Sequence, residues 1–213
     1  MTGTGSSPST GKGRATPAHP AQPQPGQQPQ HGQHPQHGSG KQVRRSAGIV
    51  LYRLAGDRPE VLLGHMGGPF WRRKDTGAWT IPKGGYTAEE DAEVAARREY
   101  AEEIGHPVPA GELIPLGEVL QANGKIVTAW AVLGDLDPAT ARSNTFEVEW
   151  PPGSGRREPF PELDRVAWFS VEEAAGKAVA AQAAFFHRLV EALTNPGRTP
   201  VETATGTTSD TST

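Results

Sequence analysis

The stretch "REYAEEIG", residues 98–105, places three carboxylates within five residues. If this segment is helical, Glu99, Glu102 and Glu103 stand at positions i, i+3 and i+4 and share one face. Like charges at that spacing destabilise an isolated helix by about 0.2–0.5 kcal/mol per pair. The C-terminal end of a helix dipole disfavours anions as well. A bound cation that takes oxygen ligands, such as Mg²⁺, would turn the repulsion into ligation.

The flanking residues predict a helix over residues 88–104. Thr87 followed by Glu90 matches a capping box, in which each side chain satisfies a free backbone N–H at the start of a helix. Gly105 stands where a left-handed C-terminal cap is required, and Pro107 prevents continuation. A small, mostly apolar row at helical spacing can lie on a sheet; it consists of Ala92, Ala96, Tyr100 and Ile104.

Short apolar runs, separated by turn residues, surround this helix. Residues 46–54 and 60–66 predict a strand pair, and residues 78–82 a third strand that Pro82 stops. Asn123-Gly124 is a strong hairpin signal between residues 113–121 and 126–136. Further strands are expected at 144–151 and 165–171, and a second helix at about 178–193. Interleaved strands and helices predict an α/β domain with a mixed sheet.

Composition limits the class of protein. The chain has 213 residues, no cysteine and a formal net charge of −3. These features exclude disulfides and thiolate metal sites, and they argue against a dedicated nucleic-acid binder. The N-terminus has no apolar run, and no 18-residue apolar stretch occurs. We therefore expect a cytoplasmic protein that neither spans nor enters a membrane, with its oligomeric state open.

The two ends of the chain differ from its centre. Residues 1–42 contain no Leu, Ile, Val or aromatic residue and are rich in Pro, Gln, Gly, Ser and His. Such a segment cannot bury enough apolar surface to offset its ordering entropy. We predict a disordered tail over residues 1–43 and another over residues 195–213. The remaining residues, 44–194, suffice for one domain.

From Gly84 to His106 the sequence resembles the Nudix box. That family's pattern is Gly, five residues, Glu, seven residues, Arg-Glu, an apolar residue, any residue, Glu-Glu, any residue, Gly and an apolar residue. Tyr100 fills the first apolar position, whereas His106 departs from the last one. The fixed positions are supplied by Gly84, Glu90, Arg98, Glu99, Glu102, Glu103 and Gly105. The resemblance implies an α/β fold, the Nudix α/β/α sandwich, with a mixed sheet and a central catalytic loop and helix.

The resemblance also implies roles for these residues. The expected ligands of Mg²⁺, or alternatively Mn²⁺, are Gly84 through its carbonyl and Glu99, Glu102 and Glu103 through their carboxylates. The expected catalytic group is Glu102, Glu103 and Arg98. Arg98 also braces loop and helix with Glu90, while Gly85 lets the backbone approach the metal and Gly105 caps the helix.

The general base is left open by the sequence. It lies within the box, at Glu102 or Glu103, or on a later loop as in some family members. Glu147, Glu149 and Glu162 are the later candidates.

Positive charge near the box is expected to bind substrate phosphates. The candidates are Lys83, which abuts the metal loop, together with Arg72, Lys74 and Arg156. An exposed tryptophan, either Trp71 or Trp150, could stack on a nucleobase.

The expected function is Mg²⁺-dependent hydrolysis of a phosphoanhydride in a nucleoside diphosphate-linked small molecule, a nucleoside or dinucleoside polyphosphate. The strand "AWTIPKGG" resembles the one that leads into the box in dinucleoside polyphosphate and diphosphoinositol polyphosphate hydrolases. Two alternatives belong to other classes. One is a Nudix-fold module that senses a nucleotide without turnover, and the other is a protein whose tails recruit a partner. The three intact carboxylates favour the enzyme.

Overall fold

The computed structural model describes residues 44–195, and the remainder of both predicted tails lies outside the described residues. The strands are β1 (Arg45–Ala55), β2 (Arg58–Met66), β3 (Trp79–Thr80), β4 (Lys83–Gly85), β5 (Ile114–Leu120), β6 (Ile126–Leu133), β7 (Thr145–Glu149), β8 (Arg157–Pro161) and β9 (Leu163–Ser170). The helices are α1 (Ala92–Ile104), α2 (Val171–Lys177) and α3 (Ala183–Thr194), with short 3₁₀ turns η1 (Pro138–Thr140) and η2 (Ala180–Gln182). No helix within residues 44–195 is long and apolar enough to cross a membrane.

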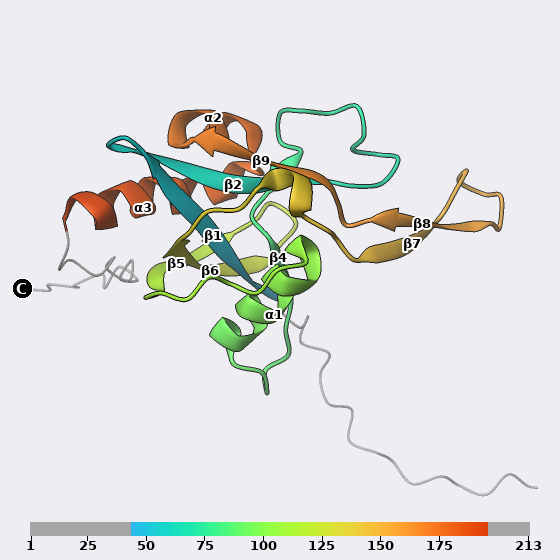
Figure 1. Cartoon of the computed structure of the whole chain (residues 1–213). Coiled ribbons are helices and arrows are strands. Elements are labelled where there is room, and N and C mark those ends of the chain that lie inside the picture. Colours follow the sequence, from blue (N-terminus) through green and yellow to red (C-terminus); the bar gives the residue numbers. More distant parts are fainter. Residues whose placement is uncertain (1–43, 196–213) are drawn as a thin grey trace, which may run out of the picture. The chain divides into compact units, whose positions relative to one another are not determined.

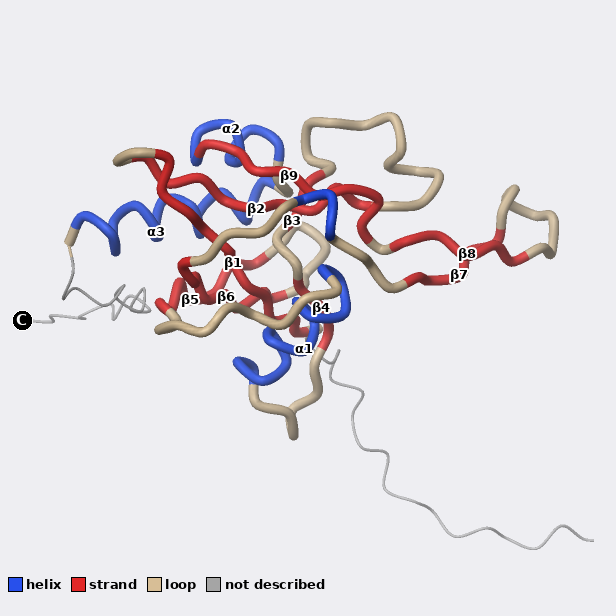
Figure 2. The backbone as a smooth tube through the Cα atoms, in the orientation of Figure 1, coloured by secondary structure: helices blue, strands red, loops and turns tan. Residues whose placement is uncertain are grey.

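The main sheet is mixed and has β1 at its centre. β1 is antiparallel to β2 and β4 and parallel to β6. Residues 46–52 of β1 are all buried, as expected for a strand covered on both faces. β2 also pairs with β3 and β9, and β6 pairs with β5 (Figure 2). The mixed sheet and the predicted β1–β2 and β5–β6 hairpins are therefore confirmed.

Alternate residues of β1 enter two separate cores. Val50 and Tyr52 belong to the core under α2 and α3, whereas Ile49 and Leu51 belong to the core under α1. Figure 1 shows α1 on one side of the sheet and α2 and α3 on the other. The result is an α/β/α sandwich, as expected. Each large apolar side chain that the helices bury contributes about 1.5–3 kcal/mol to stability. These side chains are Phe185, Phe186 and Leu189 from α3, and Tyr100 and Ile104 from α1.

The start of α1 differs from the prediction. The helix begins at Ala92, and Asp91 is its N-cap, accepting hydrogen bonds from the backbone N–H groups of Glu93 and Val94 at 2.9 and 3.1 Å. The predicted capping box at Thr87 is wrong because the Glu90 carboxylate is bound to a side chain further along the helix, described below. The predicted C-cap is confirmed, since Gly105 has φ of 78°.

The strands β4 and β8 and the helix α2 were not predicted, and the second long helix begins later than expected. α2 follows directly on β9 and has a complete capping box between Ser170 and Glu173, a signal that lies in the sequence. β8 contains Pro159 and Pro161, which argue against a strand. It is tolerated because β7 and β8 form a ribbon of their own, outside the main sheet (Figure 1).

Candidate metal and substrate site

The carboxylate face of α1 lies along a cleft of about 530 Å³. β4 and its loop contribute Lys83, Gly84 and Gly85 to the cleft, and the β5–β6 turn contributes Lys125. Glu162, the residue that precedes β9, also lines the cleft. Segments distant in the sequence therefore meet around Glu99, Glu102 and Glu103, which also line the cleft.

Arg98 offsets the repulsion among the α1 carboxylates. Its guanidinium is 2.6 Å from the Glu99 carboxylate and 3.6 Å from that of Glu102. Glu90 holds the same guanidinium with two contacts of 3.0 Å, which explains why Glu90 does not cap the helix. The carboxylates of Glu90 and Glu99, Glu90 foremost, raise the pKa of Arg98 above its ordinary value. The Glu90–Arg98 contacts join the loop after β4 to the middle of α1.

Glu103 is buried, with 5 % of its surface exposed. Its Oε2 accepts a hydrogen bond of 3.0 Å from the backbone N–H of Lys83. Burial, opposed by Lys83 and aided by the nearby Glu162, raises the pKa of Glu103 to about 8. Burial also raises the pKa of Glu99, against the opposing effect of Arg98. Glu103 therefore retains its proton to a higher pH than an ordinary glutamate does.

Gly84 leaves room for the Glu99 carboxylate. A Cβ at position 84 would overlap the Glu99 carboxylate group, so a side chain there would displace the carboxylate. Gly84 is fixed by β4, which pairs it with Ala47 of β1. The loop backbone and the helix carboxylate thus approach each other more closely than any other residue type at position 84 allows.

The three α1 carboxylates share one face and one cleft, but their side chains do not surround a common point. Within residues 44–195, no three His, Asp or Glu side chains are gathered as a ready metal site. The reason is that Glu99 faces Arg98 and Glu103 faces the Lys83 N–H. The expected convergence of the carboxylates is therefore absent from this arrangement. The donor set still suits a hard divalent cation, because it consists of carboxylates beside a glycine backbone. Glu99 contacts Arg98 through Oε1, and its Oε2 lies beside Gly84, so ligation through Oε2 does not require Arg98 to move.

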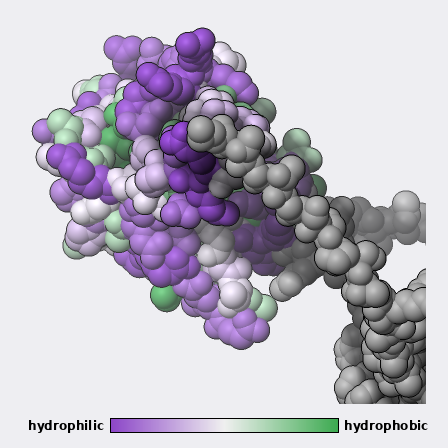
Figure 3. Space-filling model, turned by 90° about the vertical axis from the view of Figure 1, so that its right-hand side faces the viewer, coloured by the Kyte–Doolittle hydropathy of each residue, from purple (hydrophilic) through white to green (hydrophobic). Residues whose placement is uncertain are grey.

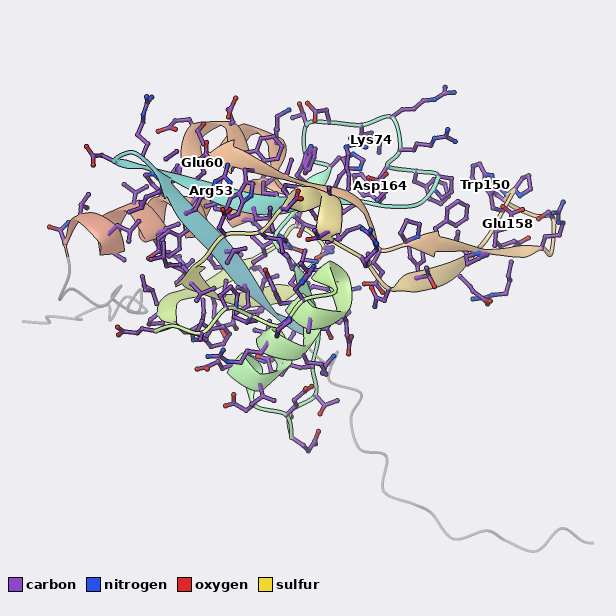
Figure 4. The ribbon with its side chains drawn as sticks, viewed as in Figure 1. Arg53, Glu60, Lys74, Trp150, Glu158 and Asp164 are labelled. Atoms are coloured by element: carbon purple, nitrogen blue, oxygen red, sulfur yellow. The ribbon has the colours of Figure 1, made fainter. Side chains whose placement is uncertain are left out.

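Of the predicted phosphate-binding cations, Lys83 alone is among the residues that line the cleft. Arg72 is exposed, and the Lys74 amine lies over the Trp71 ring at 4.5 Å. Arg156 lies at the end of the β7–β8 ribbon and contacts Glu158 at 3.4 Å. Figure 4 shows Lys74 in the loop between β2 and β3, and Glu158 on the ribbon. Arg72 and Lys74 are close to the box in sequence, but none of these three cations is among the residues that line the cleft.

The later candidates for the general base also differ in whether they line the cleft. Glu147 pairs with Arg157 at 3.1 Å along the ribbon, and Glu149 accepts a 2.7 Å hydrogen bond from the Gly155 N–H. Neither is among the residues that line the cleft, whereas Glu162 is.

The backbone of Glu162 is held from both sides. Its carbonyl accepts from the Gly67 N–H at 2.8 Å, and its N–H donates to the Asn144 carbonyl at 3.0 Å. The Asn144 N–H in turn donates to the Glu102 carbonyl at 3.0 Å. This chain of hydrogen bonds fixes Glu162 relative to the C-terminal end of α1.

The cleft also contains residues that the sequence did not single out. Lys125 reaches it from the β5–β6 turn, and burial, with Lys83 and Arg44 nearby, lowers the pKa of its amine. Phe146 lines the cleft together with Trp71, whereas Trp150 packs edge-on against Phe70 at a ring distance of 5.7 Å. The Asn-Gly turn that precedes Lys125 was the available signal, but it predicts a turn and says nothing of what the turn faces.

Comparison with known proteins identifies the family. A family model described as the NUDIX domain matches residues 42–189. No curated protein sequence matches the chain significantly. A crystal structure of an Ap4A hydrolase binary complex from C. elegans is 23% identical, with a TM-score of 0.50, and the match covers 71% of this chain and 98% of that one.

Two further solved structures are more distant. The MutT protein from Methanosarcina mazei is 20% identical, with a TM-score of 0.47 and coverage of 71% of this chain and 96% of that chain. The NUDIX domain of Shewanella oneidensis NrtR, crystallised with ADP ribose, is 16% identical, with a TM-score of 0.47 and coverage of 70% and 87%. At these identities the structural likeness concerns the fold, and the family model carries the assignment. The chain therefore belongs to the NUDIX family.

Proposed function

We propose that the chain hydrolyses a phosphoanhydride bond in a nucleoside diphosphate-linked substrate, a nucleoside or dinucleoside polyphosphate, with Mg²⁺ as its cofactor. The observation that carries the proposal is the composition of the cleft. Glu99, Glu102, Glu103 and Glu162 line it together with only two amines, those of Lys83 and Lys125. A cleft with more carboxylates than amines repels a polyphosphate unless a cation lies between them.

In this proposal the metal is held by the Gly84 carbonyl and by Glu99, Glu102 and Glu103. When bound, Mg²⁺ neutralises phosphate charge and lowers the pKa of a coordinated water. Arg98 remains fixed by Glu90 and keeps the loop after β4 against α1.

Glu162 is our candidate for the general base. It lines the cleft beside Glu103, and its backbone is fixed by Gly67 and Asn144. A carboxylate in this place can take the proton of the water that attacks phosphorus. The amines of Lys83 and Lys125 stabilise the charge that develops on the phosphate oxygens. The alternative bases, Glu102 and Glu103, are assigned here to the metal.

The charged residues that line the cleft suit a charged ligand. The side of the molecule that Figure 3 shows is mainly hydrophilic, with hydrophobic residues scattered among polar ones. Trp71 and Phe146 are the aromatic residues that line the cleft, and they can provide a stacking surface for a nucleobase. We therefore replace Trp150 with Phe146 as the partner of Trp71 in the stacking proposal.

The test is a panel of nucleoside triphosphates, dinucleoside polyphosphates and ADP-ribose, assayed with Mg²⁺, with Mn²⁺ and with chelator. We expect hydrolysis that depends on the metal, and a loss of several orders of magnitude in kcat for Glu99→Gln. Glu93→Gln is the matched control, because Glu93 is on the same helix but pairs with Arg97 at 2.9 Å. Tight nucleotide binding without turnover of any compound would favour the sensing module. Equal turnover in Glu99→Gln and Glu93→Gln would show that Glu99 has no role in the site.

A further inference from the structure

A second chamber, of about 590 Å³, adjoins the cleft. Gly85 and Lys125 line both spaces, so the two meet at the end of β4 and the β5–β6 turn. The other walls of the chamber come from the start of β1 and from the loop that leads into α1. We call it the cationic chamber; it is also lined by Arg44, Arg45, Tyr86, Thr87, Glu90 and Arg98.

The cationic chamber has the opposite charge balance to the cleft. Four cations and a single carboxylate, that of Glu90, line it. Glu90 is engaged by Arg98 through two contacts of 3.0 Å, so it does not neutralise the other three cations. Arg45 contacts Glu118 at 3.3 Å, but both side chains are close to half exposed, and such a pair contributes little. Arg44 and Lys125 make no ion pair within residues 44–195.

The fold brings these cations together at a cost. Arg44 donates a 2.7 Å hydrogen bond to the Asn123 carbonyl, which holds its guanidinium beside the turn that carries Lys125. The parallel pairing of β1 with β6, beginning at Arg45 and Ile126, fixes the same arrangement through the backbone. Like charges held at one place repel, and a multivalent anion would relieve that repulsion.

We propose that the cationic chamber binds phosphate groups of the substrate that lie beyond the scissile anhydride. The proposal rests on the proposed function and narrows its substrate class to polyphosphates whose charge extends past the pair of phosphates held in the cleft. A chain of phosphates that crosses Gly85 leaves the cleft, which is lined by carboxylates and needs a metal to bind phosphate. It then enters the cationic chamber, which is lined by arginine and lysine. Arg44 and Arg45 select for length, because they line the chamber and not the cleft, and a substrate with two phosphates does not reach them.

Arg44→Gln tests this selectivity. We expect the ratio of KM for a dinucleoside tetraphosphate to KM for ADP-ribose to rise about tenfold, the usual order for one charge-assisted phosphate contact. The value of kcat should change by less than about twofold. Arg45→Gln is a second variant in which the hydrogen bond to Asn123 is intact. Arg58→Gln is the control for net charge, since exposed Arg58 pairs with Ala55 at the opposite end of β1.

A binding measurement separates the chamber from catalysis. Inorganic tripolyphosphate, titrated calorimetrically in the presence of chelator, should bind Arg44→Gln about tenfold more weakly than Arg58→Gln. Equal affinities, or equal rises in KM for both substrates, would overturn the chamber proposal. Tripolyphosphate that inhibits without competing with the tetraphosphate would also overturn it, because the anion would then occupy a site separate from the substrate. Failure of every compound to be hydrolysed, in contrast, would refute the proposed function.

Discussion

Replacing Glu103 with glutamine removes a carboxylate charge from a buried position and preserves the shape of the side chain. The amide oxygen of glutamine can still accept from the Lys83 N–H, which Glu103 accepts at 3.0 Å. In the wild type, burial raises the pKa of Glu103 from 4.5 to about 8. The folded protein therefore keeps a proton that the unfolded chain loses as the pH rises past 4.5. As the pH rises from 4.5 to about 8, the free energy of unfolding of the wild type falls relative to that of Glu103→Gln, and above about 8 the difference stays constant.

The size of the effect follows from the two pKa values. At about 1.4 kcal/mol for each tenfold change in a proton equilibrium, the difference between 4.5 and about 8 corresponds to about 5 kcal/mol. We expect Glu103→Gln to be about as stable as the wild type near pH 4.5 and more stable by several kcal/mol at pH 9. Urea unfolding of both proteins in chelator, repeated from pH 5 to 9, measures the difference directly.

Adding Mg²⁺ to the same experiment should shift the stability of the wild type, relative to the variant, in the opposite direction. The metal favours the ionised carboxylate, so at a hundredfold excess over Kd it should recover about half of the loss in wild-type stability at pH 9. Glu103→Gln should respond weakly to Mg²⁺ and hydrolyse its substrate orders of magnitude more slowly. A stability difference that is constant across this pH range would refute the reasoning, because Glu103 would then titrate as it does in the unfolded chain.

Three further perturbations test other parts of the site and the core. Mg²⁺ should raise the stability of the wild type by about 2.7 kcal/mol at a hundredfold excess over Kd. In thermal melts at fixed ionic strength, Glu102→Gln should lose this gain and Glu93→Gln should retain it. Equal responses of the two variants would show that Glu102 is not a ligand. Gly84→Ala should displace the Glu99 carboxylate and abolish the Mg²⁺ response; a normal response in calorimetry would contradict the close approach. Gln182→Ala should cost about 1–3 kcal/mol in urea unfolding, because the buried amide oxygen accepts at 3.0 Å from the Ile81 N–H; an unchanged free energy of unfolding would show that water replaces it.

The sequence by itself determined the features that depend on neighbours along the chain. Glu99, Glu102 and Glu103 share a face because they are three and four residues apart on a helix. Gly105 ends that helix because only glycine readily adopts its positive φ. The β5–β6 hairpin follows from the Asn-Gly turn. The family resemblance was visible for the same reason, since the box is a local pattern of 23 residues.

The N-terminal cap of α1 could not be predicted from neighbouring residues alone. Thr87 and Glu90 have the spacing of a capping box, yet Asp91 is the cap. A capping box needs the Glu90 carboxylate, and Arg98 binds it with two charge-assisted contacts that outweigh a neutral one.

Only the tertiary structure decided which charges meet the carboxylates. Arg72 and Lys74 are near Lys83 in sequence, but the cleft is completed by Lys125 and Glu162 instead. The contacts that place these two residues are pairings between β1 and β6 and between β2 and β9, which join segments far apart in the chain. Strand pairing depends on backbone hydrogen bonds and shared burial, and neither carries a local signature of its partner. The sequence thus defines the carboxylate face of α1, and long-range pairing of strands defines what lies opposite it.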